Sequence, residues 1–180
     1  MKRLTLLRHA KSDWDDPVAR DFDRPLNRRG GKAALLIGQF AKSKKMHFDT
    51  LVASPAVRVV QTLETFFQGY GETIDTRWDR RIYLASAPTL FDVVRDLPDS
   101  ADNALLVGHN PGLEELILDL VADDGANPLR EDVEIKFPTA SLAVMDLAID
   151  SWKDARENMA SLVSFTRPRD LDPALGPNAR

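Results

Sequence analysis

Two arginines and two histidines stand where apolar runs of the sequence end. Arg8 and His9 lie in "LLRHAKS", Arg58 lies in "SPAVRVVQT" and His109 lies in "VGHNPG". A guanidinium matches two oxygens of a phosphoryl group and keeps its charge at every working pH. A neutral imidazole can attack as a nucleophile. If the chain brings these four side chains together, they could bind a dianion and accept its phosphoryl group.

The first motif leads from a strand-like run into a polar loop, and the other two join such a run to the start of a helix. In "LVASPAVRVV", we expect Ser54 to be the N-cap and Pro55 the first helical residue, which puts Arg58 in the first turn. In "LLVGHNPGLEEL", Asn110 is the expected cap and Pro111 the expected start. Open parallel sheets bind ligands beyond the carboxyl ends of their strands. The three junctions are therefore predicted to face one small volume.

The remaining pattern alternates strands with amphipathic helices and predicts an α/β fold. Apolar runs that suit buried strands occur at Leu4–Leu7, Thr50–Ala53, Ala104–Val107, Leu142–Ile149 and Leu162–Phe165. A weaker run, Thr73–Trp78, is expected at a sheet edge. Helical patterns between the strands predict a three-layer α/β/α sandwich with a mainly parallel central sheet. The last two strands follow each other closely, which permits an antiparallel edge.

We expect a single domain over residues 1–167. The segment 168–180 contains three prolines and little to bury, so it is predicted to be a poorly ordered tail. The 180 residues carry a formal charge of −4, which gives no general attraction to nucleic acid or acidic membranes. The chain contains no cysteine, no apolar run of membrane-spanning length and no secretory pattern at its start, so we expect a cytoplasmic protein.

Taken singly, each candidate residue has a plainer explanation. Arg8 could be a solvated residue at a strand end, and His9 or His109 could be a hydrogen-bonded core histidine. His47 has no such context and is expected on the surface. Four such residues at three equivalent junctions favour a shared site instead.

The three motifs resemble those of the histidine phosphatase superfamily, which has the phosphoglycerate mutase-like fold. "LLRHAKS" resembles its Arg-His-Gly motif, with Ala10 in place of the usual glycine. That change, the segment "DRPLNRRG" and the small size are most similar to the SixA branch, the phosphohistidine phosphatases. Only 51 positions separate Arg58 from His109, which leaves little room for the helical lid of larger mutases. An open site suits a bulky substrate such as a phosphorylated protein.

The resemblance implies a role for each matching residue. His9 would be the nucleophile, while Arg8, Arg58 and His109 would hold the phosphoryl oxygens. Ser12 matches a position near the substrate in relatives. The adjacent cations should keep the imidazole of His9 neutral, and a neighbouring backbone carbonyl could fix its tautomer. With charge offset in this way, no metal or other cofactor is required.

The proton donor is where the sequence departs from the superfamily. Relatives offer an acidic residue after the third strand, and in "WDRRIYLASAP" the only carboxylate is Asp79, between Trp78 and two arginines. A surface position is its plainer explanation. An alkoxide leaves poorly without an acid, whereas a phosphorylated imidazole can leave as neutral imidazole. A missing acid therefore favours cleavage of a P–N bond in a phosphorylated protein, such as a histidine-phosphotransfer domain.

Several alternatives stay open. Within the same superfamily, the substrate could be a small phosphate ester, or the reaction could be that of a mutase. A module of another class would recognise phosphorylated partners through the same residues without turnover. A metal hydrolase could use His9, His109 and either Asp13 or Asp16. The composition fits a monomer or a weak dimer.

Overall fold

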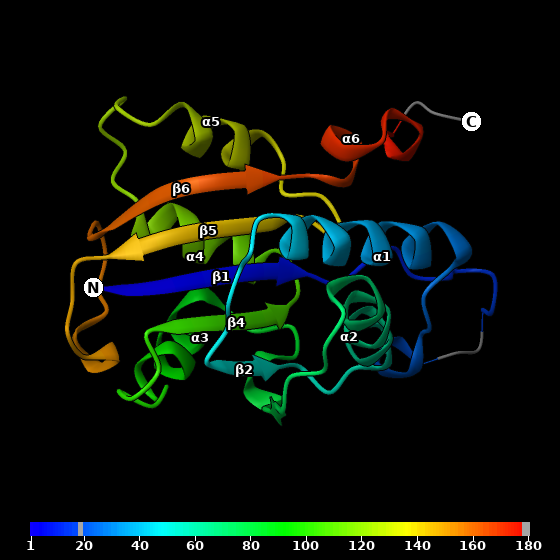
Figure 1. Cartoon of the computed structure of the whole chain (residues 1–180), viewed down its shortest axis with the longest axis horizontal. Coiled ribbons are helices and arrows are strands. Elements are labelled where there is room, and N and C mark those ends of the chain that lie inside the picture. Colours follow the sequence, from blue (N-terminus) through cyan, green and yellow to red (C-terminus); the bar gives the residue numbers. More distant parts are fainter. Residues whose placement is uncertain (18–19, 178–180) are drawn as a thin grey trace.

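The computed structural model describes residues 1–17 and 20–177, and these form one central sheet with helices on both faces (Figure 1). Within these residues the sheet has six strands in the order β3-β2-β4-β1-β5-β6. Their bounds are β1 Lys2–Arg8, β2 Thr50–Ala53, β3 Thr76–Trp78, β4 Asn103–Gly108, β5 Leu142–Leu147 and β6 Ala160–Thr166. The five strongest strand predictions are confirmed, and the weak run shortens to β3 at the expected edge.

The sheet is mixed, with its parallel part on the side that carries the three motifs. Strand β4 pairs in parallel with both β1 and β2, and β2 pairs in parallel with β3. Strand β5 is antiparallel to β1, and β6 is antiparallel to β5. The antiparallel edge is thus confirmed. The carboxyl ends of β1, β2 and β4 meet at one edge of the sheet, as the sequence predicts.

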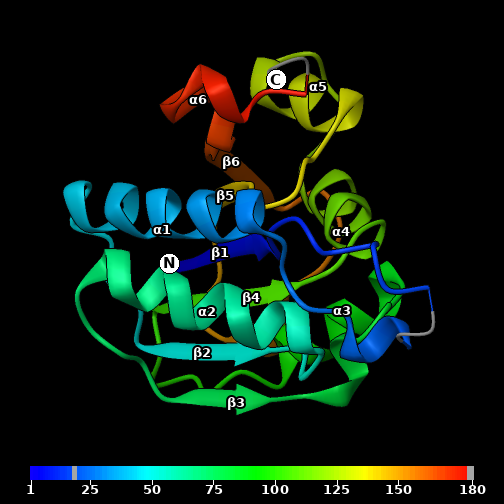
Figure 2. The ribbon, with the colours of Figure 1, turned by 90° about the vertical axis from the view of Figure 1, so that its right-hand side faces the viewer.

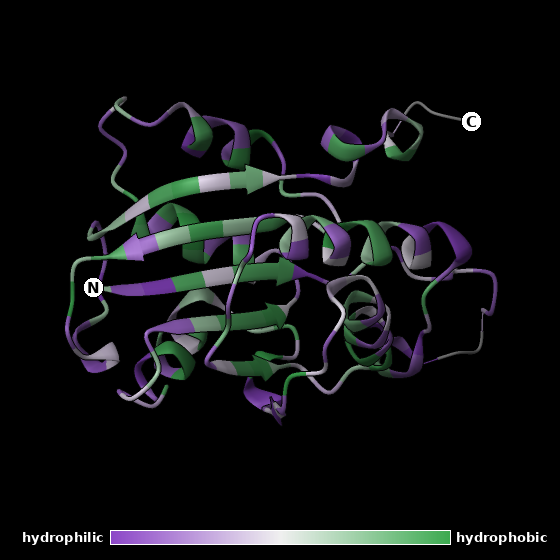
Figure 3. Ribbon diagram, viewed as in Figure 1, coloured by the Kyte–Doolittle hydropathy of each residue, from purple (hydrophilic) through white to green (hydrophobic). Residues whose placement is uncertain are grey.

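The helices cover the sheet in two layers (Figure 2). Their bounds are α1 Arg28–Ser43, α2 Val57–Tyr70, α3 Ala87–Arg95, α4 Gly112–Leu120, α5 Pro128–Ile135 and α6 Pro168–Leu171. Helices α1 and α2 belong to one apolar cluster and α3 and α4 to another, with the apolar residues of the strands between them (Figure 3). The predicted α/β/α sandwich is confirmed.

Glycines let α1 and α2 approach each other closely. A Cβ atom on Gly38 would lie 2.2 Å from the carbonyl oxygen of Phe66, and one on Gly69 would lie 2.3 Å from that of Leu35. Any larger side chain at either position would push the helices apart. This contact fixes the direction of α2, and hence the place of its first turn.

Both helix starts differ by one or two residues from the sequence prediction. Helix α2 begins at Val57 after an N-cap at Ala56, and α4 begins at Gly112 after an N-cap at Pro111. Ser54 does not cap α2: its hydroxyl contacts Nε2 of His109 and the amide of Ala56, which precedes the helix. Arg58 still falls in the first turn of α2.

Residues 168–177 belong to the segment 168–180 that the sequence predicts to be a poorly ordered tail, and the structure places regular elements in them. The segment forms α6 and a 3₁₀ turn at Pro173–Leu175, and Leu171 and Leu175 pack against the cluster that contains α1. Arg29 donates a hydrogen bond to the carbonyl of Gly176. Residues 178–180 of the predicted tail lie outside the described residues.

Candidate active site

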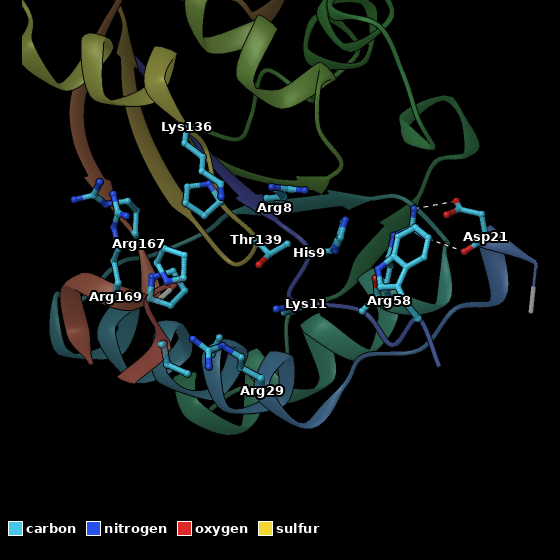
Figure 4. Close-up of a pocket in the computed structure, with 17 residues that line it drawn as sticks. Arg8, His9, Lys11, Asp21, Arg29, Arg58, Lys136, Thr139, Arg167 and Arg169 are labelled. Atoms are coloured by element: carbon cyan, nitrogen blue, oxygen red, sulfur yellow. Dashed lines mark hydrogen bonds and ion pairs between the residues drawn. The ribbon is translucent and has the colours of Figure 1, made fainter. Parts of the chain in front are cut away.

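Arg8, His9, Arg58 and His109 do come together, at the carboxyl ends of β1 and β4. The amide of His9 donates to the carbonyl of Gly108, which continues the parallel pairing one residue beyond β1. The ring centroids of His9 and His109 are 5.3 Å apart. A pocket of about 510 Å³ opens here, and Arg8, His9 and Arg58 line it (Figure 4).

His9 is held as a neutral imidazole with one nitrogen available. Its Nδ1 lies 2.7 Å from the carbonyl oxygen of Ala10, and because a carbonyl can only accept, Nδ1 carries the proton. Nε2 then has the lone pair. Burial, with smaller contributions from Arg58 and Arg8, lowers the pKa of His9 to about 4, against the opposing effect of the Ala10 hydrogen bond. The prediction of a neutral ring with a tautomer fixed by a carbonyl is confirmed.

Thr62 ties the strand that carries His9 to the helix that carries Arg58. Its fully buried hydroxyl accepts from the amide of Ala10 at 2.9 Å and donates to the carbonyl of Arg58 at 2.6 Å. The backbone segments on either side of the pocket are therefore linked by one side chain. Sequence reasoning missed Thr62, although a threonine four residues after Arg58 is a known pattern for a hydroxyl that bonds to its own helix.

Arg8 carries positive charge into the pocket with part of its hydrogen-bonding capacity unused. Its Nη1 donates to the carbonyl of Phe137 at 2.9 Å. Its Nε is buried and has no hydrogen-bond partner in the described part of the chain. Burial lowers the pKa of Arg8, with Glu114 acting in the opposite direction, but an arginine remains protonated at neutral pH. Such a group is well suited to an anion.

Arg58 is almost fully buried and is oriented by Asp21. Its two terminal nitrogens donate to the backbone carbonyl of Asp21 at 2.7 Å and to its carboxylate at 3.0 Å. Burial alone would raise the pKa of Asp21, but hydrogen bonds from Tyr83 and Arg58 outweigh it and lower this pKa. Asp21 is thus an ionised carboxylate within the pocket wall, and sequence reasoning missed it.

His109 contacts Arg58 and does not line the pocket. Its Nδ1 accepts from Arg58 at 3.3 Å, so Nε2 carries the proton and donates to the hydroxyl of Ser54 at 2.8 Å. Burial, His9 and Arg58 lower the pKa of His109 to about 3. Both ring nitrogens are engaged within the protein, and in this state His109 supports Arg58. Its predicted contact with phosphoryl oxygens stays a prediction.

The two remaining candidates are placed very differently. Ser12 is buried and lines the pocket, and its carbonyl accepts a hydrogen bond from the side chain of Asn27, the N-cap of α1. Asp79 caps the 3₁₀ turn Arg80–Ile82 and forms an ion pair with Arg81 at 2.8 Å. That arginine lowers the pKa of Asp79, and Asp79 does not line the pocket.

The rest of the pocket wall is rich in cations that sequence reasoning did not single out. Their side chains come from four separate segments, and all of them carry a positive charge (Figure 4): Lys11, Arg29, Lys136, Arg167 and Arg169. Among the described residues, the only acidic side chain in the lining is that of Asp21. The arrangement can bind an anion much larger than one phosphoryl group.

Two further findings concern the described residues as a whole. Within 1–17 and 20–177, no group of three or more histidine, aspartate and glutamate side chains is placed so that it could hold a metal ion. No helix in this part of the chain is both long and apolar enough to cross a membrane.

The sequence and the fold are similar to those of known proteins. Residues 4–81 match the model of the histidine phosphatase superfamily (branch 1). An uncharacterized protein of Mycobacterium tuberculosis (strain ATCC 25618 / H37Rv) is 34% identical over 164 residues, which cover 91% of this chain and all of that protein.

Two solved structures are similar over nearly the whole chain. One, assigned as the phosphohistidine phosphatase SixA of Agrobacterium tumefaciens, is 30% identical with a TM-score of 0.76 and covers 93% of this chain and 98% of its own. Another with the same assignment, from Nakamurella multipartitia, is 26% identical with a TM-score of 0.81 and covers 93% of this chain and 96% of its own.

Proposed function

Because the chain belongs to the histidine phosphatase superfamily and is a phosphatase of its SixA-type branch, we propose that it removes phosphate from phosphohistidine in a protein partner. The reaction passes through a phosphorylated His9 and needs no metal. One observation carries this proposal. The Nδ1 of His9 is bound to a carbonyl, which leaves the lone pair on Nε2, and His9 lines a pocket together with Arg8 and Arg58.

In the first step, the Nε2 lone pair of His9 attacks phosphorus, and the bond from phosphorus to the substrate nitrogen breaks. The substrate imidazole, protonated on its other nitrogen, leaves as neutral imidazole. Arg8 and Arg58 offset the charge on the phosphoryl oxygens, which would otherwise repel the nucleophile. In the second step, water attacks the phosphorus on His9, the P–N bond breaks and inorganic phosphate departs.

The described residues of the pocket lining include no acid with a proton to give, and this supports a P–N substrate. Among the described residues, Asp21 is the only carboxylate in the lining, and its lowered pKa keeps it ionised. Asp79, the position expected from the resemblance, is held in an ion pair with Arg81. An alkoxide leaving group needs a proton as it departs, whereas a protonated phosphoimidazole does not. The pocket therefore suits phosphohistidine better than an alkyl phosphate.

The test compares a phosphohistidine protein with small phosphomonoesters, in the presence of a chelator. We expect the phosphohistidine protein to be the better substrate and to leave an acid-labile label on the enzyme after rapid quenching. His9→Ala should lose turnover by roughly 10⁴-fold or more and should not become labelled. His47→Ala removes an exposed histidine at the surface and is the matched control.

Each of the other outcomes would assign a different function to the protein. Preference for small esters would make the enzyme a phosphomonoesterase. Loss of activity with chelator, restored by a metal, would assign a metal hydrolase. Binding of phosphate with no turnover of any substrate would assign a recognition module. Full activity in His9→Ala would remove His9 as the nucleophile.

A further inference from the structure

The pocket is much larger than the phosphoryl group that His9 would accept. Its volume is about 510 Å³, whereas a phosphoryl group has the bulk of only a few water molecules of about 30 Å³ each. We call the part beyond His9 the cationic arm, defined by Lys11, Arg29, Lys136, Arg167 and Arg169. Figure 4 shows that Lys136, Arg167 and Arg169 lie on the opposite side of His9 from Arg58 and Asp21.

The charge of the cationic arm runs against that of the whole chain. The protein has 28 acidic and 24 basic residues, yet five basic residues gather here and, among the described residues, no carboxylate of the lining lies on this side of His9. Arg167 has an ion pair with Asp170, and Arg29 bonds to the carbonyl of Gly176. The side chains of the other three cations of the arm form no hydrogen bond or ion pair with the described residues. The positive charges of the arm repel one another, and a bound anion would offset this repulsion.

The pocket lining also contains apolar residues beside these cations. Pro138, Pro168, Leu175 and Pro177 line the same pocket, and the last three belong to the C-terminal segment that carries Arg169. An inorganic polyphosphate has no apolar groups that could pack against these residues. A peptide segment could place its aliphatic groups on the prolines and its carboxylates on the cations. The mixture therefore favours an acidic stretch of protein over a small inorganic polyanion.

An exposed tryptophan at the same pocket points the same way. The side chain of Trp14 lines the pocket although the residue is 69% exposed, and the guanidinium of Arg24 stacks on its ring at 3.3 Å. Burying so large an aromatic side chain against a partner is favourable, and tryptophan and arginine are enriched at protein interfaces. A protein partner could cover this ring while its phosphorylated side chain reaches His9.

We propose that the cationic arm binds acidic side chains of the phosphoprotein that lie next to the phosphohistidine in space. This inference rests on the proposed function, because it names which phosphohistidine proteins the same site prefers. Opposite charges at the mouth of a site raise the rate of association and make it dependent on salt. The arm would therefore select partners mainly through kcat/KM at low ionic strength.

The test uses one carrier protein that holds a phosphohistidine, in two forms. In the first form the residues around the phosphohistidine are Asp and Glu, and in the second they are Asn and Gln. We expect kcat/KM to favour the acidic form by about tenfold at low salt, since a few exposed charge pairs together supply about 1–2 kcal/mol. The preference should shrink as salt is added.

Variants then assign the preference to the arm. The triple variant Lys11→Gln/Lys136→Gln/Arg169→Gln removes the three cations whose side chains form no hydrogen bond or ion pair with the described residues, and it should bring the ratio of the two rates close to one. The matched control Lys44→Gln/Lys45→Gln/Lys153→Gln removes three exposed charges outside the pocket lining. It should keep the preference. Equal rates on the two carriers with the unaltered enzyme would overturn the proposal.

Failure of the proposed function can be separated from failure of this inference. Binding of both carriers to His9→Ala reports on the arm even if neither carrier is dephosphorylated. His9→Ala should bind the acidic carrier more tightly than the amide carrier, and this preference should disappear when the triple variant is combined with His9→Ala. That result would support the proposed role of the cationic arm even without turnover. Equal binding of the two carriers, with inorganic tripolyphosphate bound tightly and only when the arm is intact, would assign the arm to a small polyanion and overturn the proposal.

Discussion

The pocket has two ends that differ in how their charged groups are held. At the end formed by strand junctions, the side chains of His9 and Arg58 are more than nine-tenths buried, and each is fixed by neighbouring groups. In the cationic arm, Lys11 and Lys136 are exposed, and their side chains have no hydrogen-bond partner in the described part of the chain. The first end is oriented before any ligand arrives, and the second can adapt to what it meets.

This difference matches two different tasks. Stabilising a transition state requires groups whose positions are already fixed, because reorientation during the reaction would raise the barrier. Attracting and selecting a partner requires charge at the surface, where long side chains keep their freedom and act over a range of positions. The fixed end should therefore control turnover, and the cationic arm should control which partner is turned over.

Replacement of Arg58 tests whether the fixed end of the pocket controls turnover. Arg58→Ala removes the guanidinium that lies between Asp21 and His109, and we expect turnover to fall by about 10²–10³-fold. A loss no larger than that of Lys136→Gln would show that the two ends do not differ. The measurement is kcat on a phosphohistidine carrier for both variants under the same conditions.

Arg58→Lys is the informative control. A lysine restores the charge but cannot donate to the carbonyl and the carboxylate of Asp21 in the geometry of the guanidinium. We expect it to recover little of the lost turnover. Circular dichroism and thermal unfolding of both variants show whether the loss comes from the site or from the fold. Full recovery with lysine would mean that charge alone, and not orientation, is what the fixed end supplies.

The fixed end was also the predictable one, for a physical reason. Parallel strands align their carboxyl ends, so a residue that follows an apolar run is placed by the sheet itself, as His9 and His109 are. Arg58 was correctly placed even though its helix starts later than expected, because the first turn still faces the same edge. The sequence pattern thus determines where these side chains begin.

The supporting contacts and the cationic arm could not be read from the sequence. Asp21 reaches Arg58 from the 3₁₀ helix Asp21–Asp23, and the hydroxyl of Thr62 reaches beyond its own helix to the amide of Ala10. Arg169 lies in a segment that proline content marks as a tail, and only its packing on α1 brings it to the pocket. Such contacts depend on tertiary packing between distant segments, which has no periodic signature.

The pH dependence of stability gives a second comparison between buried and exposed groups. The folded protein holds His9 and His109 with pKa values near 4 and 3, whereas an unfolded chain has histidine near 6.5. Between these values only the unfolded state binds the protons, so stability falls as the pH drops below about 6.5. We expect each ring to remove about 2 kcal/mol from the free energy of unfolding between pH 7 and pH 5.

Urea denaturation at pH 7 and pH 5 measures this loss. His47→Gln serves as the parent, because the chain has three histidines and this change leaves only the two buried ones. Adding His9→Gln should reduce the loss by about half. The same loss in both proteins would show that the fold does not lower the pKa of His9 below that of the unfolded chain.

The smallest expected effect marks where the fixed end stops. Asp79 occupies the position at which the superfamily pattern leads one to look for an acid, yet it caps a turn, pairs with Arg81 and does not line the pocket. Arg81 lowers the pKa of Asp79, so the group has no proton to give near neutral pH.

Asp79→Asn keeps the side chain's size and its capping oxygen, and it should slow hydrolysis of aryl or alkyl phosphates by less than about tenfold. General acid catalysis contributes roughly 10²–10⁴-fold. Steady-state rates on one phosphohistidine carrier and one aryl phosphate therefore decide the matter. A loss near 10³-fold on the ester alone would bring Asp79 into the reaction, and it would extend the fixed end of the pocket to the edge strand β3.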